Sequence, residues 1–309
     1  MKSPGSLIRA GTPHHARWLR DLAVAVPFVV PYLVLFVFFK LGPLAVNILA
    51  SLTQLDITGI GNFIGLGNFV KLASDTLFWR ALGNTFYYLA LVGPINIVGG
   101  FLLALLLNQP LRGRIATRTV VFMPYIIMVT VVGMIWRWIL DTRFGILNYY
   151  LSMLGIPAIS WLTSSSISMI AIVIASVWWT IGYNTVIFLA ALQDIPKELL
   201  DAAAIDGAGP LRKVISVVIP GVKSAVYFVV LTTVIYSMQV FGQVYTMTGG
   251  GPNYSTVTVV HYLYIQGFRT FHLGYAASIG FVLFVTVIIL SVLINAAFTE
   301  RRQKIGVTK

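Results

Sequence analysis

The sequence has no cysteine, and only nine of its 309 residues are acidic. The absence of cysteine excludes disulfide bonds, thiolate catalysis and thiolate metal sites. Charged residues make up 10% of the chain, although a soluble domain usually carries about 25%. The hydrophobic share is 58% and the mean hydropathy is +0.89, so polar groups cannot cover the surface and lipid must be part of the solvent.

Sequence motifs for catalysis are absent as well. The chain has no GxxxxGKS or GxxxxGKT loop for ATP, and no HExxH or GxSxG motif of a hydrolase. His14, His15, His261 and His272 lie in expected tails or outer loops, which favours surface side chains over metal ligands. These absences predict that the chain is not an enzyme and binds neither a metal nor a cofactor.

Six apolar runs of about 18 or more residues, each free of Asp, Glu, Lys and Arg, predict membrane-spanning helices. Backbone groups must bond internally within hydrocarbon, so helices are expected there. The sequence therefore predicts an all-α, polytopic bundle of six transmembrane helices. The runs cover residues 22–39, 81–107, 119–136, 167–192, 224–242 and 273–298.

The basic residues alternate between the two sides of this predicted bundle. Of the 21 Lys and Arg residues, fifteen lie in the two tails, in the loop after the second run, or in and beside the loop 193–221. Cytoplasmic loops carry such an excess, so both termini are expected in the cytoplasm. The net charge of +12 then reflects membrane topology rather than nucleic acid binding. The predicted parts are a tail 1–21, a transmembrane domain 22–298 and a tail 299–309.

Four of the nine acids lie in the cytoplasmic loop, whose sequence from residue 194 to 220 is DIPKELLDAAAIDGAGPLRKVISVVIP. Asp194 is expected to cap a helix whose first turn holds Pro196. Gly207 would end that helix, and a second short helix is expected from Leu211 toward Pro220. The pattern predicts a charged helix–turn–helix on the cytoplasmic face. The alternative is a solvated connector, although such a length is unusual for a loop without a function.

The same loop resembles the "EAA" loop of permease subunits in binding-protein-dependent ABC importers. In that pattern E-A-A is followed after three residues by Gly, and after nine more by I-x-L-P. The matching run here is Asp201-Ala202-Ala203, Gly207 and Val217-x-Ile219-Pro220. The likeness covers nearly the whole chain and points to the carbohydrate-uptake branch, which includes maltose and glycerol-3-phosphate permeases. It is supported by FIGLGNF at 63–69, FWRALGNT at 78–85, FGILN at 144–148, TGGGPNYST at 248–256 and GYAAS at 274–278.

This resemblance implies that the loop forms a coupling helix that docks on a separate ATPase subunit. The residues expected at that contact are Glu198, Asp201, Ala202, Ala203, Asp206 and Gly207. It also implies two ATPase subunits that bind ATP and Mg²⁺, an extracytoplasmic substrate-binding protein, and a second, different permease subunit in a heterodimer. The binding protein is expected to contact the outer loop at Gly249, Gly250, Gly251, Pro252 and Asn253.

Two polar stripes are predicted to line a substrate pathway, at positions that resemble those of the sugar site in maltose-type permeases. A neutral sugar needs flat aromatic faces and a few hydrogen-bonding groups inside an apolar cavity. The alternative is that the Ser and Thr residues lie at helix–helix contacts, where small side chains favour close packing. The candidates are Ser176, Thr180 and Tyr183 on the fourth run, Thr233, Tyr236, Ser237 and Val240 on the fifth, and, as second-rank candidates, Asn184 and Gln239.

Arg137, in WRW at 136–138, is expected near the outer end of the third run. The simpler interpretation is that it extends to the headgroups between two interfacial tryptophans. Phosphate binding is the alternative, because phosphate sites favour arginine. No other basic residue is expected to reach the pathway, which favours a neutral sugar over glycerol-3-phosphate.

Together these features predict half of the membrane channel of an ATP-driven sugar importer, in the cytoplasmic membrane of a bacterium or archaeon. An importer of glycerol-3-phosphate or a related phosphodiester is the alternative within this class. An ion-coupled secondary transporter and a membrane scaffold without a substrate are alternatives from other classes. Ion-driven carriers usually need an intramembrane carboxylate, and none lies within the apolar runs.

Overall fold

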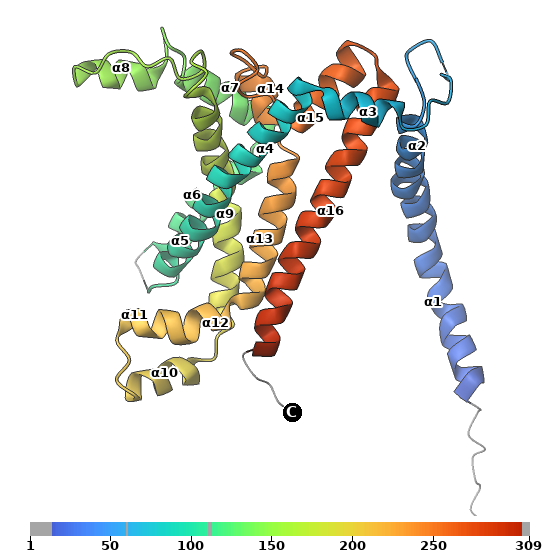
Figure 1. Cartoon of the computed structure of the whole chain (residues 1–309). Coiled ribbons are helices and arrows are strands. Elements are labelled where there is room, and N and C mark those ends of the chain that lie inside the picture. The colour runs from blue at the N-terminus through green and yellow to red at the C-terminus, as the bar shows by residue number, and fades with distance from the viewer. Residues whose placement is uncertain (1–13, 60, 111–112, 305–309) are drawn as a thin grey trace, which may run out of the picture.

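The computed structural model describes residues 14–59, 61–110 and 113–304, with only the backbone described for 14–24 and 300–304. Residues 1–13 and 305–309 of the two expected cytoplasmic tails lie outside the described residues. Within the described ranges, every regular element is a helix (Figure 1). The fold is therefore all-α, as the sequence predicted.

The helices occur in long and short segments, and four of the segments have π-helical geometry. In chain order they are α1 His14–Phe36, η1 Val37–Leu41, α2 Gly42–Ser51, α3 Gly67–Ser74, α4 Thr76–Pro94, η2 Ile95–Gly99, α5 Gly100–Leu107, α6 Arg114–Ile126, α7 Val129–Ile139, α8 Ile146–Met153, α9 Ser168–Gln193, α10 Lys197–Ile205, α11 Pro210–Lys213, η3 Val214–Val218, α12 Ile219–Gly221, α13 Lys223–Met238, α14 Gly242–Met247, α15 Val259–Tyr264, η4 Ile265–Arg269 and α16 Leu273–Lys304.

Four of these helical segments are long and apolar enough to cross a membrane, and they agree with four of the predicted runs. They are Ala25–Ser51, Thr76–Leu107, Ser168–Gln193 and Leu273–Thr299. Two bent pairs would raise the number to six if each pair is one span. These are Arg114–Ile126 with Val129–Ile139, and Pro210–Gly221 with Lys223–Met238.

The third predicted run is not the continuous helix that was expected over 119–136. The axis turns by 99° between α6 and α7, because Ile127 and Met128 leave the helical conformation. The Trp179 indole donates a hydrogen bond to the carbonyl oxygen of Ile127 at 3.0 Å, which satisfies an acceptor freed by the break. The break brings the first turn of α7 close to the middle helices of the bundle.

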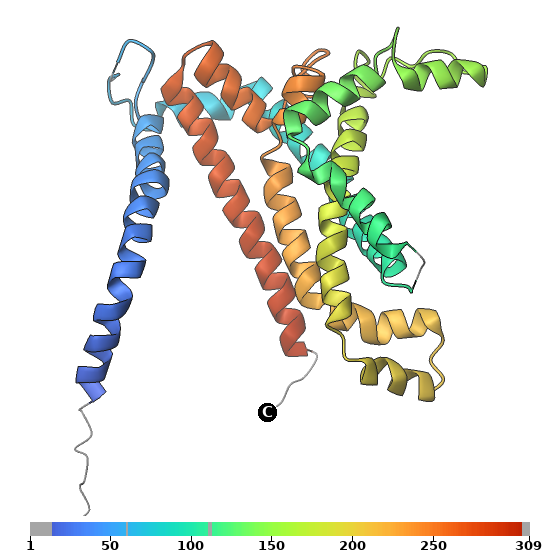
Figure 2. The same ribbon diagram turned by 180° about the vertical axis from the view of Figure 1, so that it is seen from behind.

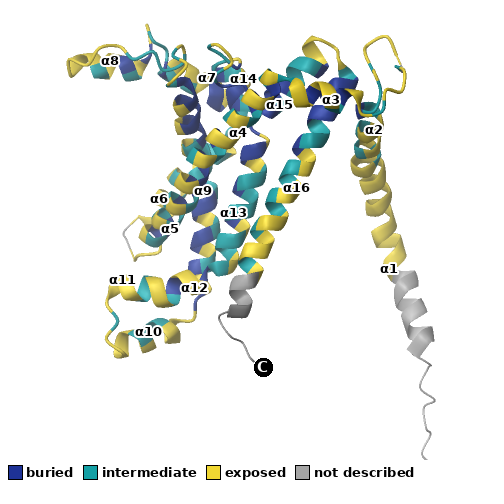
Figure 3. Cartoon of the chain, in the orientation of Figure 1, coloured by how far each residue is buried: buried dark blue, intermediate teal, exposed yellow. Residues whose placement is uncertain are grey.

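α9 lies at the centre of the bundle, with α5 and α6 on one side and α13 on the other (Figures 1 and 2). Its apolar residues are spread around the whole circumference, as expected of a helix surrounded by others. Gly182 allows α6 to approach closely, because a Cβ there would lie 2.0 Å from the carbonyl oxygen of Val121. Burial is accordingly concentrated on α9 (Figure 3).

The first long helix stands apart from the other spans. α1 continues into η1, and α2 then packs on α16 at the end of the bundle that is predicted to face outward, called here the outer end (Figures 1 and 2). Gly274 permits this contact, since a Cβ would lie 2.1 Å from the carbonyl oxygen of Thr53. In the most apolar window of Ala25–Ser51, 0% of the residues are buried, and residues 25–41 expose an apolar surface (Figure 3).

The loop 194–221, predicted to be cytoplasmic and called here the cytoplasmic loop, forms two short antiparallel helices, α10 and α11–α12, beyond the end of α9 (Figure 1). Gly207 reverses the chain with a φ of +75°, a conformation that suits glycine. One prediction was wrong: Asp194 does not cap α10 but ends α9, and Pro196 precedes α10 without a side-chain cap. α9 extends through Gln193, so Asp194 lies at a helix end rather than at a helix start.

Candidate functional site

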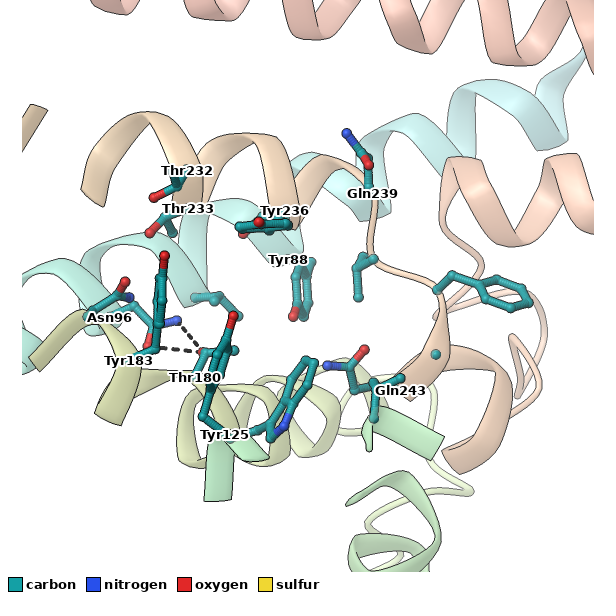
Figure 4. Close-up of a pocket in the computed structure, with 18 residues that line it drawn as sticks. Tyr88, Asn96, Tyr125, Thr180, Tyr183, Thr232, Thr233, Tyr236, Gln239 and Gln243 are labelled. Carbon is teal, nitrogen blue, oxygen red and sulfur yellow. Dashed lines mark hydrogen bonds between the residues drawn. The ribbon is translucent and has the colours of Figure 1, made fainter. Parts of the chain in front are cut away.

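A cavity of about 330 Å³ lies among α4 and η2, the α6–α7 break, α9, and the α13–α14 connection (Figure 4). Its walls combine aromatic rings with amide and hydroxyl groups, and none of the lining residues is acidic or basic. The lining residues are Tyr88, Val92, Asn96, Tyr125, Val129, Trp179, Thr180, Tyr183, Asn184, Thr232, Thr233, Tyr236, Ser237, Gln239, Val240, Phe241, Gly242 and Gln243.

Eight of the nine pathway candidates from the sequence line this cavity, and one does not. Those that do are Thr180, Tyr183, Asn184, Thr233, Tyr236, Ser237, Gln239 and Val240. Ser176 lies one turn too far along α9 and is buried in the helix contacts, with its hydroxyl donating to the carbonyl oxygen of Ile172 at 2.8 Å. For Ser176 the alternative interpretation, a small residue at a helix contact, describes its position better.

Aromatic rings form one wall of the cavity. Tyr125 on α6 stacks on Tyr183 of α9, with ring centroids 4.6 Å apart, and lies 5.8 Å from Trp179. Tyr236 reaches in from α13 with 65% of its surface exposed. Flat ring faces of this kind suit the C–H faces of a sugar.

Polar side chains on the other walls divide into paired and unpaired groups. The Asn96 amide donates to the Thr180 hydroxyl at 2.9 Å (Figure 4). Thr180 in turn donates to the carbonyl oxygen of Ser176 at 2.7 Å. In contrast, four lining side chains at most 7% exposed have no hydrogen-bond partner among the described residues. Buried polar groups normally have a partner, so groups open to a cavity are available to a ligand. They are Asn184, Thr233, Ser237 and Gln243.

Sequence reasoning missed the walls contributed by the second and third runs. Tyr88, Val92 and Asn96 are four residues apart and share one face of α4 and η2. The π-helical turn η2 begins directly after Pro94, which has no N–H for the usual helical bond. The spacing of Tyr88 and Asn96 on one helix face could have revealed this stripe from the sequence. No such spacing identifies Tyr125, because it lies in the last turn of α6, where the expected continuous helix breaks.

The coupling-loop candidates lie together on the surface of α10 and its turn. Glu198, Asp201, Ala202, Asp206 and Gly207 are exposed, and Ala203 is half-buried. Apolar side chains beside them are also exposed, with Ile205 at 86%, Leu199 at 54% and Leu211 at 74%. Exposed apolar groups grouped in this way are typical of a protein–protein contact.

The outer-loop candidates divide into exposed and inward-facing residues. Gly249 and Asn253 are exposed and adopt positive φ, whereas Gly251 and Pro252 are half-buried. Gly250 is buried, and a Cβ there would lie 2.7 Å from the ring of His261, so Gly250 cannot contribute a surface contact.

His261 itself corrects the expectation of surface histidines. It is 1% exposed, and its Nδ1 has no hydrogen-bond partner among the described residues. Burial, with a smaller effect of Arg269, lowers the pKa of His261 to about 4. His272 is exposed as expected, and the side chains of His14 and His15 lie outside the described residues.

Arg137 does not reach the cavity. It is exposed on α7 and lines a separate outer hollow with Met134, Trp138, Asp141 and Phe144. The interpretation as an interfacial arginine beside tryptophans fits this position.

Comparison with known proteins identifies the class. The profile of the family described as "Binding-protein-dependent transport system inner membrane component" matches residues 96–305. The chain belongs to this family, and it is therefore a membrane component of a transport system.

Two relatives are named as permease proteins of transport systems, and one solved structure has the same fold. The chain is 34% identical over 280 residues to the sn-glycerol-3-phosphate transport system permease protein UgpA of Yersinia pestis, covering 89% of this chain and 94% of that protein. It is 30% identical over 276 residues to the sulfoquinovosyl glycerol transport system permease protein SmoG of Agrobacterium fabrum, covering 88% and 90%. A chain of a bacterial ABC transporter that imports the acidic polysaccharide alginate has the same fold, with a TM-score of 0.80, 22% identity and coverage of 95% and 100%.

Proposed function

We propose that this chain is one permease subunit of an ATP-driven importer and forms half of the translocation pathway for a sugar. The observation that supports this most directly is the cavity, in which aromatic faces stand opposite buried amide and hydroxyl groups without partners. Such a site binds a molecule with many hydroxyl groups and apolar C–H faces. The residues proposed to line the pathway are those of the cavity, with Tyr125, Tyr183 and Tyr236 as ring platforms.

The uncharged cavity favours a neutral sugar over glycerol-3-phosphate. Phosphate sites usually contain Arg or Lys, and no lining residue is basic. Glycerol-3-phosphate, named for UgpA, stays the alternative substrate, because the partner subunit can contribute a basic residue to a shared pathway.

The exposed surfaces support a larger assembly. Residues 25–41, in α1 and η1, leave their apolar side chains uncovered by the described part of this chain, which fits a second, different permease subunit and lipid around them. Two ATPase subunits, which bind ATP and Mg²⁺, would dock on the α10–α12 loops of the two permeases. An extracytoplasmic binding protein would deliver the sugar to the outer loops near Gly249 and Asn253.

In this function the chain changes conformation but carries out no covalent step. With both bent pairs counted as spans, six spans would leave both termini and the coupling loop on one side of the membrane. The excess of Lys and Arg in these segments favours the cytoplasmic side of a bacterial or archaeal cytoplasmic membrane. ATP-driven closure of the ATPase subunits would move the coupling loops, and the spans would switch the cavity between inward- and outward-facing states. Each state must be favoured by contacts with its partners.

Reconstitution tests this function against the alternatives. Proteoliposomes with both permeases and the ATPase should take up the sugar that the binding protein selects from a sugar panel, and only with ATP and the binding protein. Uptake by this chain alone under an ion gradient would support a secondary transporter instead. Uptake of glycerol-3-phosphate but of no sugar would support the alternative substrate, and absence of any uptake would support a scaffold.

A further inference from the structure

Two stretches that are far apart in the sequence, 78–85 and 248–256, are bonded to each other on the outer face. Asn84, on α4, donates from its side-chain amide to the carbonyl oxygen of Tyr254 at 3.0 Å and to that of Val257 at 2.9 Å. Both acceptors belong to the outer loop that holds the proposed binding-protein contact. One side chain therefore fixes the position of this loop relative to α4.

Two further hydrogen bonds tie the same loop to the walls of the cavity. The Thr85 hydroxyl accepts from the backbone N–H of Val259 at 3.0 Å, and α15 lies against the start of α4 (Figure 1). The Thr258 hydroxyl donates to the carbonyl oxygen of Val240 at 2.8 Å, and Val240 lines the cavity. The loop thus bridges the α4 wall and the α13–α14 wall.

The loop keeps its own shape through internal hydrogen bonds. The hydroxyls of Thr248 and Thr256 lie 2.8 Å apart, and Thr256 also donates to the carbonyl oxygen of Gly251 at 2.9 Å. Thr256 is completely buried. These bonds do not involve Asn84, so loss of the Asn84 amide should leave the loop folded but detach it in part from α4.

α4 leads from Asn84 directly into the cavity. Tyr88 follows one turn later on the same helix face, and Asn96 lies two turns beyond Tyr88 in η2. A hydrogen-bonded helix is stiff along its axis. A displacement of the outer loop would therefore shift Tyr88, which precedes Pro94 on the regular helix α4, relative to the α9 wall of the cavity.

We propose that Asn84 is a positioning residue that transmits docking of the binding protein, on the loop 248–258, to the cavity wall formed by α4. The inference rests on the proposed function, since it requires a binding protein that docks on this loop. It assigns to Asn84 a role in the response to docking rather than in docking itself.

The test uses the complete transporter in lipid nanodiscs, with the partner permease, the ATPase subunits and the sugar-loaded cognate binding protein as the probe. Asn84→Ala removes both donors, and Asn84→Asp removes them at nearly constant shape. Affinity for the binding protein and basal ATP hydrolysis should stay within about twofold of wild type. Stimulation of hydrolysis by the binding protein should fall about tenfold, as expected for the loss of two hydrogen bonds.

Asn68→Ala is the matched control. Asn68 also donates two hydrogen bonds to backbone carbonyls, those of Ser51 and Thr53, both at 2.9 Å, but does not touch the loop 248–258. It should keep full stimulation. An equal loss of stimulation in Asn68→Ala would overturn the specific role of Asn84.

Two other outcomes would overturn the inference. Normal stimulation in both Asn84 variants would exclude transmission, and a parallel loss of affinity and stimulation would show that Asn84 only shapes the docking surface. Asn84→Ser, which keeps one donor, should give an intermediate loss and replaces the alanine variant if that does not assemble. A wild-type transporter that does not respond to its binding protein would contradict the proposed function instead.

Discussion

The outer face and the cytoplasmic loop of this protein are held together in different ways. On the outer face, Asn68, Asn84 and Asn148 each donate two hydrogen bonds to backbone carbonyls, and Asp75 accepts four. In the described loop 194–221, the only side-chain hydrogen bond runs from Ser216 to the carbonyl oxygen of Arg212, at 2.6 Å.

This difference indicates how each end is used. The outer loops keep a fixed shape by themselves, so they can present a ready-made surface to a soluble partner and pass on its contact. The cytoplasmic loop leaves Ile205 and Leu211 exposed beside charged residues, so its conformation and position depend more on what covers it. Mutations should therefore affect stability on the outer face, and coupling on the cytoplasmic face.

The largest effect is expected from Gly207→Val in the cytoplasmic loop. A Cβ at Gly207 would meet nothing within 4 Å, so the penalty comes from the φ of +75°, which costs a residue with a Cβ about 1–2 kcal/mol. The turn should rearrange, and sugar-dependent ATP hydrolysis and uptake should be uncoupled, with uptake reduced at least about tenfold. Uptake and hydrolysis are measured together in proteoliposomes.

Gly209→Val is the control for this variant, because Gly209 has the same open surroundings but a φ of −65°. It should couple normally. Equal uncoupling by both substitutions would show that added bulk, not the backbone conformation, is responsible. Unchanged coupling in Gly207→Val would remove the turn from the coupling contact.

The next largest effect is expected in the cavity between the two faces. Tyr236→Ala removes an aromatic ring from the cavity wall. Sugar uptake per assembled complex should fall about tenfold, as expected for one lost ring contact. The amount of assembled complex should fall less than uptake does. Tyr227→Ala, on the same helix but directed at Phe298 and Asn295, is the control. Equal uptake by Tyr236→Ala and wild type at matched amounts would exclude Tyr236 from the pathway.

On the outer face, His261 should make stability depend on pH. The folded-state pKa of about 4 lies below the ordinary 6.5, so unfolding takes up a proton when the pH is between these values. Stability should therefore fall as the pH drops below 6.5, by up to about 3 kcal/mol at pH 4. His261→Gln should flatten this dependence in thermal unfolding of the purified chain. His272→Gln, at an exposed position, should not, and an unchanged slope in His261→Gln would refute the assignment.

The smallest effect is expected from Asp75→Asn. Burial alone would raise the pKa of Asp75, but hydrogen bonds from Tyr262, Tyr275 and the amides of Phe78 and Leu77 hold the pKa below its usual 3.8. The stabilisation is thus present above pH 3.8 and is lost only as the pH falls through the lower folded value.

The Asp75→Asn variant can still accept at the helix start but loses part of the Tyr262 and Tyr275 contacts. We expect about 1–2 kcal/mol of destabilisation that is constant from pH 5 to 8. Asp56→Asn, whose exposed carboxylate accepts only from Thr58, should be nearly neutral in the same thermal unfolding experiment. A loss of equal size in both variants would contradict the role of the two tyrosines.

Local patterns accounted for most of the fold. The apolar runs matched four long helices within about five residues, except that the first helix continues to Ser51, twelve residues beyond the predicted end at residue 39. The match is local because exclusion of charge from hydrocarbon depends on each segment alone. The two short helices of the cytoplasmic loop, and the glycine turn between them, also followed from local signals. The break at Ile127 and Met128 did not, because it is stabilised by Trp179, more than fifty residues away.

The candidate site was only half predictable for the same reason. Residues on α9 and α13 were proposed from their spacing together with the resemblance to maltose-type permeases. Tyr125 and Gln243, in contrast, became wall residues through contacts between distant segments. His261 was misjudged because it lies between two apolar runs and was therefore assigned to an exposed outer loop, whereas Gly250, Phe241 and Tyr245 enclose it in space. Which helix faces meet is a non-local property that one sequence does not reveal.

The exposed apolar surface of residues 25–41, in α1 and η1, has a consequence for the lifetime of the protein in the cell. A newly made chain without the proposed second permease subunit, called here its companion, would expose this apolar helix to the proteases that degrade unassembled membrane proteins. Its abundance should then follow that of the companion chain, and overproduction of this subunit by itself should yield short-lived molecules. Pulse-chase measurement of its half-life, with and without coexpression of the companion, would reveal this dependence.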